Sequence, residues 1–114
     1  MLATANQTSE KGSAHVDSLS ALAQELRRFV DDRDWDQFHS PKNLSMALAV
    51  EVAELLEHFQ WLTEEESHSL SDEKLAEVRD EIGDTLIYLV RLADVLGVDP
   101  LDAARDKVKK NEEK

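Results

Sequence analysis

The chain has 114 residues, the size of one domain, and it contains no cysteine, which excludes disulfides, thiolate metal sites and a cysteine nucleophile. Its net charge of −12 argues against a nucleic-acid backbone or an anionic membrane surface as the main partner. Hydrophobic residues make up 41% of the chain, with only three glycines and two prolines, so the composition favours an all-α domain with a packed core.

Residues 1–16 are polar and lack the basic start and apolar stretch of a signal peptide, so we expect a disordered tail there. No apolar run approaches the roughly 18 residues that a membrane-spanning helix needs. The sequence therefore predicts a cytoplasmic protein with one helical domain over residues 17–114.

The first predicted helix begins near Asp17 or Ser18, because either side chain can cap a helix. The pattern fades over the charged residues 31–34, and a loop over residues 35–39 follows, which holds two aromatic residues and a histidine. The apolar residues of this first helix recur at helical spacing, at Leu19, Leu22, Leu26, Phe29 and Val30.

A second helix is expected to start at Ser40 and Pro41, a capping side chain followed by proline at the first helical position, and to run to about Leu62. This helix is apolar nearly all round, which is typical of a helix inside an assembly rather than at its edge. An acidic, serine-rich loop is predicted over residues 63–71.

A third helix, capped by Ser71 or Asp72, is expected to run to about Leu96, where Gly97 ends it. Asp99 and Pro100 open a fourth helix by the same cap-and-proline device as in the second. The helices together predict a mostly antiparallel four- to five-helix bundle, and the broad apolar surface of the second helix implies an oligomer.

Two pairs of carboxylates stand near the centres of the two long helices. Glu51 and Glu54 are three residues apart and share a helix face, and Glu81 and Asp84 repeat the spacing on the next long helix. Facing carboxylates are costly to bury without a partner, and a hard divalent cation removes that cost. The alternative is a solvated helix face, which is harder to set aside for the third helix, where Arg91 and other charged residues could also be exposed.

A di-iron carboxylate bundle is the nearest rival to this oxygen-lined metal site. That design requires Glu-x-x-His on two helices. The only such match is Glu65 with His68, which falls in the predicted acidic loop, so the rival fits poorly.

Four short motifs follow one another along the chain, and their order resembles that of a known family. D-W-D-Q-F-H-S-P-K-N-L (34–44) is followed by E-V-A-E (51–54), F-Q-W (59–61) and E-I-G-D-T-L-I-Y (81–88). This series resembles the MazG-like all-α nucleotide pyrophosphohydrolases, and most of all their single-domain dCTP pyrophosphatase branch, over about residues 17–114.

The resemblance implies an enzyme that cuts (deoxy)nucleoside triphosphates into a monophosphate and pyrophosphate, with a dCTP-like pyrimidine preference and a role in cleansing the nucleotide pool. It implies dependence on Mg²⁺, with Mn²⁺ as a possible substitute. It also implies a homodimer, or a homotetramer built from two dimers, whose sites combine helices of different subunits.

The resemblance also assigns roles by position. The catalytic residues and metal ligands it implies are the four carboxylates Glu51, Glu54, Glu81 and Asp84. The substrate-binding residues it implies are two aromatics that enclose the base, a phenol, a K-x-x-x-N element for phosphates and three residues at the loop-to-helix junction: Trp35, Trp61, Tyr88, Lys107, Asn111, His39, Lys42 and Asn43. Leu26 departs from the pattern, because the nearest eukaryotic-type members carry a base-contacting histidine there.

These residue types suit the chemistry. A nucleoside triphosphate is a polyanion and this chain is acidic, so a metal ion is needed to bridge carboxylates and phosphates. Any one of the four carboxylates that is not fully used as a ligand can accept a proton from water, and Glu54 is one candidate among them. The alternative function is a non-catalytic helical oligomer that binds nucleotides or a partner protein, and the presence of all four carboxylates argues against it.

Overall fold

The computed structural model describes residues 18–114, which form five α-helices and one short 3-10 helix, with no strand in that range. The all-α prediction is therefore confirmed. The predicted tail over residues 1–16 and the capping role of Asp17 lie outside the described residues. In chain order the elements are α1 (Leu19–Asp32), η1 (Asp36–Phe38), α2 (Pro41–Glu57), α3 (Glu64–Ser67), α4 (Asp72–Val95) and α5 (Pro100–Glu112).

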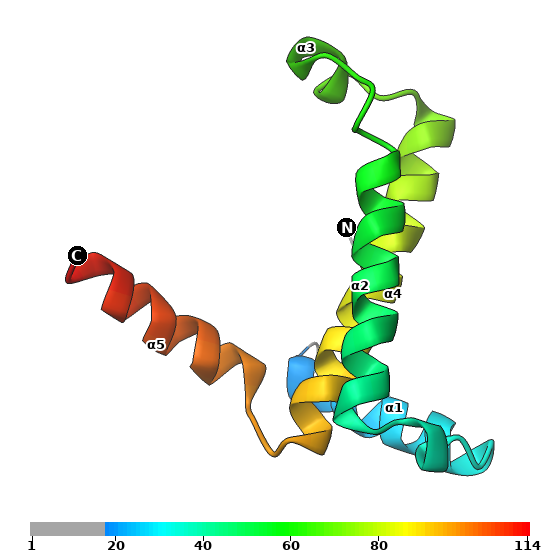
Figure 1. The fold of residues 1–114 in the computed structure, drawn as a ribbon, viewed down its shortest axis with the longest axis vertical. Coiled ribbons are helices and arrows are strands. Elements are labelled where there is room, and N and C mark those ends of the chain that lie inside the picture. Colours follow the sequence, from blue (N-terminus) through cyan, green and yellow to red (C-terminus); the bar gives the residue numbers. More distant parts are fainter. Residues whose placement is uncertain (1–17) are drawn as a thin grey trace, which may run out of the picture.

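The centre of the fold is an antiparallel hairpin of α2 and α4, and α1 packs across the end of that hairpin (Figure 1). At the end where the chain passes from α2 to α4, the Nδ1 of His58 lies 3.3 Å from the Nζ of Lys74 in the first turn of α4. The core is small and draws on all three helices, with Val30, Leu44, Val78, Val90 and Ala93 buried.

Helix α1 begins where Ser18 accepts a hydrogen bond from the backbone N–H of Ala21, so the Ser18 cap is confirmed. The helix ends at Asp32, and Asp34 beyond the cap residue Arg33 adopts a left-handed backbone conformation with φ of 54°. The backbone N–H of Trp35 then donates to the carbonyl of Val30 at 3.0 Å, which closes the last turn in the manner of a Schellman motif. This hydrogen bond fixes the position of Trp35 just beyond the end of α1.

Helix α2 begins at Pro41 with Ser40 as its cap, as predicted, but it ends at Glu57 rather than at Leu62. The apolar pattern continues through residues 58–62, yet these residues form turns. A capping box then starts α3, with the Thr63 hydroxyl bonded to the N–H of Glu66 and the Glu66 carboxylate bonded to the N–H of Thr63. The predicted loop over 63–71 therefore contains one helical turn, and the chain changes direction to make it.

The predicted start and end of the third helix are confirmed. Ser71 caps α4, and Gly97 ends it in the left-handed conformation with φ of 70°. The N–H of Val98 donates to the carbonyl of Ala93 at 2.8 Å, so the two helix ends share one motif. Asp99 then caps α5, and its carboxylate accepts hydrogen bonds from the first turn of that helix.

Much apolar surface is left uncovered. Along α2, the side chains of Met46, Val50, Val52 and Leu56 are exposed. Helix α5 projects from the rest of the chain and is exposed from Leu101 onward (Figure 1). Among residues 18–114, no helix combines the length and apolar character needed to cross a bilayer.

Candidate functional site

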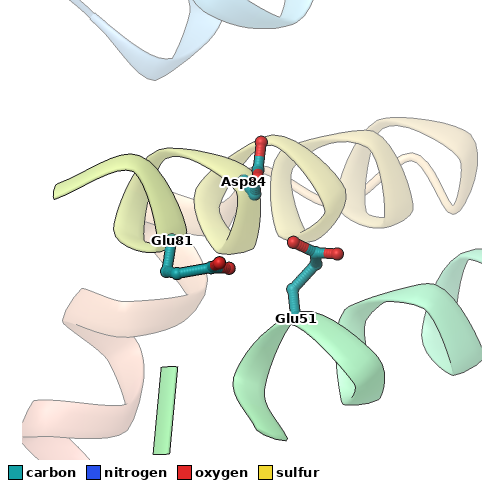
Figure 2. Close-up of side chains that lie close together, drawn as sticks. All are labelled: Glu51, Glu81 and Asp84. Carbon is teal, nitrogen blue, oxygen red and sulfur yellow. The ribbon is translucent and has the colours of Figure 1, made fainter. Parts of the chain in front are cut away.

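Three carboxylates meet halfway along the α2–α4 hairpin. Glu51 reaches across from α2, and Glu81 and Asp84 come from one face of α4 (Figure 2). One carboxylate oxygen of each residue lies within 4.8 Å of the others. The i, i+3 spacing on α4 places both of its acids beside α2, so the antiparallel packing of two helices is sufficient to form the group. Such a group of acids can hold a metal ion.

The group is electrostatically strained in the absence of a cation. Burial and then the neighbouring charges of Glu54, Asp84 and Glu81 raise the pKa of Glu51. Burial likewise raises the pKa of Glu81, followed by the charge of Glu54 and a hydrogen bond shared with it. Glu54 therefore belongs to the same cluster, as the sequence predicts, although it stands outside the closest set of three.

One oxygen in the group supports the fit to a metal. Glu81 Oε2 is buried and has no hydrogen-bond partner among the described residues. A buried carboxylate oxygen without a partner is costly in free energy, and a hard cation supplies the missing contact. The donors are all carboxylate oxygens, the set that Mg²⁺, Ca²⁺ and Mn²⁺ prefer.

A cavity of about 320 Å³ adjoins the carboxylates and shares Asp84 with them. Its aromatic wall is formed by Phe29 and Trp35, whose rings pack edge to face with centroids 5.5 Å apart. Phe29 belongs to α1, and the guanidinium of Arg33 lies 3.6 Å from the centre of its ring. This cation–π contact helps to hold the aromatic wall in place. The cavity is lined by Leu26, Phe29, Val30, Trp35, His39, Asp84, Ile87, Tyr88 and Arg91.

The floor of this cavity contains a buried arginine that the sequence analysis did not assign to the site. Arg91 is 4% exposed, so the possibility of a solvated residue at this position is wrong. Its Nε donates to His39 Nδ1 at 3.3 Å, and its terminal nitrogens lie 3.5 Å from Asp36 and 3.5 Å from Asp94. Asp94 also accepts two hydrogen bonds from Arg27 on α1, at 2.7 and 2.5 Å.

The position of Arg91 explains why spacing alone could not find it. Its partners His39 and Asp36 lie 52 and 55 residues earlier in the chain, so no local pattern joins them. The available signal was an arginine two turns after Asp84, in the last turns of α4, where Asp94 is the one other charged residue.

The remaining predicted substrate residues fall into two groups. Tyr88 and His39 line the cavity with Trp35. Asn43, in the first turn of α2, donates its side-chain amide to the carbonyl of Phe38 at 3.1 Å, which orders the loop, and Lys42 beside it is exposed.

Three further predicted residues lie apart from this cavity within one chain. Trp61 is 85% exposed in the turn that follows α2, at the opposite end of the hairpin from α1 (Figure 1). Lys107 and Asn111 are exposed on the projecting helix α5. A single chain therefore brings the carboxylates and one aromatic cavity together but leaves these three residues outside.

Comparison with known proteins agrees with this architecture. The model of the MazG-like family matches residues 46–114. The protein is 45% identical over 82 residues to human dCTP pyrophosphatase 1, covering 67% of this chain and 48% of that protein. It is 43% identical over 94 residues to the bovine dCTP pyrophosphatase 1, covering 77% of this chain and 56% of that one. The chain thus spans about half the length of the curated relatives it matches.

A solved structure extends the match to the fold. The crystal structure of a pyrophosphatase from Archaeoglobus fulgidus aligns with a TM-score of 0.80 and 41% sequence identity, covering 90% of this chain and 96% of that one. The family model covers more than half of the sequence, and it includes all four clustered carboxylates. By sequence match, helical architecture and carboxylate arrangement, this chain belongs to the MazG-like family.

Proposed function

We propose that the protein hydrolyses (deoxy)nucleoside triphosphates between the α and β phosphates, releasing a nucleoside monophosphate and pyrophosphate, with a preference for pyrimidines of the dCTP type. The observation that carries the proposal is the shared position of Asp84, which belongs both to the carboxylate group and to the lining of the aromatic cavity. A base in the cavity would therefore bring its phosphates toward the carboxylates. The pyrophosphatases among its relatives support this reaction class.

The metal we propose is Mg²⁺, with Mn²⁺ as a substitute, held by Glu51, Glu81, Asp84 and the adjacent Glu54. When bound, the cation supplies charge that neutralises the phosphates and the departing pyrophosphate. Glu54 lies at the edge of the group and is the candidate to accept a proton from the attacking water.

The other residues bind and orient the substrate. The exposed part of the Trp35 ring, 44% of the residue, offers a face on which a base can stack. Tyr88 lies one turn after Asp84 on α4 and places a phenol between the base and the phosphates.

We further propose that the working form is a homodimer or a homotetramer built from two dimers. Trp61, Lys107 and Asn111 lie outside the cavity of their own chain, and a second copy could deliver equivalent residues to it. The uncovered apolar side chains of α2 are the natural contact surface for that copy.

The test is a panel of triphosphates incubated with the protein in Mg²⁺, in Mn²⁺ and in EDTA, with pyrophosphate and monophosphate measured separately. We expect equal amounts of the two products, release only with metal, and faster release from dCTP than from purine triphosphates. Inorganic phosphate with a diphosphate product would contradict the proposed bond cleavage.

A complete absence of turnover would favour the alternative of a non-catalytic, nucleotide-binding oligomer. Calorimetric titration of dCTP in Ca²⁺ would then detect binding without hydrolysis. If dCTP does not bind either, both the enzyme hypothesis and the nucleotide-binding hypothesis are ruled out, and a partner protein is left as the ligand.

A further inference from the structure

Each nitrogen of the Arg91 guanidinium faces a partner within the protein. Its Nε donates to His39 Nδ1, and its two terminal nitrogens face Asp36 and Asp94. A guanidinium carries only donors and does not lose its proton in proteins. The nitrogen of His39 that faces Arg91 must therefore act as an acceptor, which means that it carries no proton.

This contact determines the state of His39. A neutral imidazole carries its one proton on the nitrogen that is not accepting, which here is Nε2. Burial and then the positive charge of Arg91 lower the pKa of His39, against the opposing charge of Asp36, which is the direction that favours the neutral ring. His39 Nε2 has no hydrogen-bond partner among residues 18–114, and His39 lines the cavity.

The cavity has a direction along α4. Asp84, Tyr88 and Arg91 all line it and succeed one another on one face of the helix. Seven residues of helix span about 10 Å, so the carboxylates stand at one end and the Arg91–His39 pair at the other. Phosphates placed at Asp84 leave room for a sugar beside Tyr88 and put the base beside His39.

We propose that Arg91 is a positioning residue for base selection: it holds His39 as the neutral Nε2–H tautomer, so that the cavity presents an N–H donor to the pairing edge of the base. The inference rests on the proposed function, and it deepens the substrate class. Cytosine fits this donor through N3, which accepts a hydrogen bond, whereas O2 accepts one in all three pyrimidines and does not distinguish them. Thymine and uracil carry a proton on N3, which would face the His39 proton and be rejected.

The first experiment needs no substrate. Long-range ¹H–¹⁵N correlation spectra of the protein, with His39 assigned by comparison with His39→Gln, report which ring nitrogen carries the proton. We expect an unprotonated Nδ1 and a protonated Nε2 in the native protein, and a mixture of tautomers in Arg91→Met. A native His39 with its proton on Nδ1, or a tautomer unchanged in Arg91→Met, would overturn the proposal.

Arg27→Met is the matched control. It removes the other arginine that pairs with Asp94 and leaves the contact between Arg91 and His39 in place. The control separates loss of stability from loss of positioning, because thermal melts should shift in both methionine variants while the His39 tautomer changes only in Arg91→Met.

The second experiment measures base selection. The ratio of kcat/KM for dCTP over dTTP should fall roughly tenfold in Arg91→Met and in His39→Leu, the effect of one hydrogen bond, mainly through KM for dCTP. His39→Gln, which retains an N–H donor, should keep most of the selectivity, and Arg27→Met all of it. An unchanged ratio in His39→Leu would sink the proposal even if Arg91→Met fails to fold.

Failure of the proposed function gives a different result. If no triphosphate is hydrolysed, the tautomer of His39 still tests the role of Arg91, and calorimetric binding of dCMP against dTMP replaces the kinetic ratio. Hydrolysis with the expected tautomer but equal rates for dCTP and dTTP would confirm the enzyme and refute the selection by His39.

Discussion

At the scale of single residues, function and stability oppose each other at the carboxylate group. Glu51 and Glu81 have raised pKa values because burial and neighbouring acids disfavour their charged forms. The protein keeps these acids together although the empty group is costly. A site of this kind is expected to be less stable than a mutant that lacks one charge, and to recover that loss when a cation binds.

The first prediction follows from this opposition. Glu51→Gln should raise the melting temperature in EDTA, abolish the stabilisation by Mg²⁺ and reduce turnover by roughly a thousandfold or more, while the helical CD signal is kept. Asp84→Asn should lose turnover in the same way. Glu57→Gln, an exposed residue at the end of the same helix, is the control and should change none of these. Retained activity in both site variants would disprove the metal assignment.

The second prediction concerns pH. In metal-free protein, the folded state holds the protons of Glu51 and Glu81 more tightly than the unfolded chain does, because both pKa values are raised. The free energy of unfolding in EDTA should therefore fall as the pH rises from the ordinary glutamate range through the raised values. Urea titrations at a series of pH values measure this slope, which should be shallower in Glu51→Gln.

Asp94 acts in the opposite sense and in a lower pH window. The hydrogen bonds from Arg27 hold its pKa below the ordinary aspartate value, so its contribution is present above that value and lost as the pH falls further. One series of urea titrations over the full pH range distinguishes the two effects, because the window of Asp94 lies at lower pH than that of the two glutamates. A free energy of unfolding in EDTA that rose with pH through the glutamate range would contradict the clustering of the acids.

At the scale of elements, the helix ends position the site. The left-handed residues Asp34 and Gly97 end α1 and α4, and each ending is closed by a hydrogen bond from the second residue beyond the cap. The first ending fixes the entry to Trp35 and the cavity wall. The second sends α5 away from the hairpin (Figure 1).

The third prediction contrasts two glycines. Gly97→Ala should lower the free energy of unfolding by about 1 kcal/mol, because a Cβ is strained at a φ of 70° even though no atom crowds it. Gly83→Ala, inside α4 with space around its Cβ, should raise it by roughly 0.5–1 kcal/mol. Chemical denaturation in EDTA measures both. Equal signs for the two substitutions would contradict the assigned backbone conformations.

The elements also show which features a sequence reveals. Ser40, Ser71 and Asp99 were predictable as caps because capping acts within one turn of the chain. The end of α2 was predicted wrongly, because residues 58–62 keep an apolar pattern and the change of direction depends on the capping box that follows. The carboxylate spacing was readable because one helix face holds each pair.

Contacts between distant segments were not readable. The burial of Arg91 depends on Asp36 of η1, on His39 directly after η1 and on Asp94 of its own helix, and no sequence spacing encodes contacts between these segments. The same limit applies to Trp61 and Lys107. The family resemblance names them as substrate-binding residues, but the sequence could not show where they lie relative to the cavity.

At the scale of the whole molecule, charge opposes assembly while apolar surface favours it. Each chain carries a net charge of −12, and the exposed apolar side chains of α2 lie on the same molecule. Like-charged copies repel one another over distances that salt screens, about 10 Å at 0.1 M.

The fourth prediction is that raising the salt concentration strengthens the oligomer. Sedimentation velocity at low and at moderate NaCl should show a smaller dissociation constant at moderate salt, and Mg²⁺ should lower it further by neutralising the carboxylate group. Val50→Asp, on the exposed face of α2, should yield monomers, whereas Asp102→Ser on α5 serves as a surface control. A monomer under all these conditions would contradict the proposed assembly.

The two tryptophans occupy distinct environments, one edge to face with Phe29 in the cavity wall and the other 85% exposed at the far end of the hairpin. Their fluorescence can therefore be separated by mutation. Trp61→Phe leaves a single emitter in the proposed base cavity, whose quenching reports nucleotide occupancy. Trp35→Phe leaves an emitter on the outer surface, whose spectral shift toward the blue reports the arrival of a second subunit. The chain thus contains its own optical probes for the two events, substrate capture and assembly, that the proposed mechanism combines.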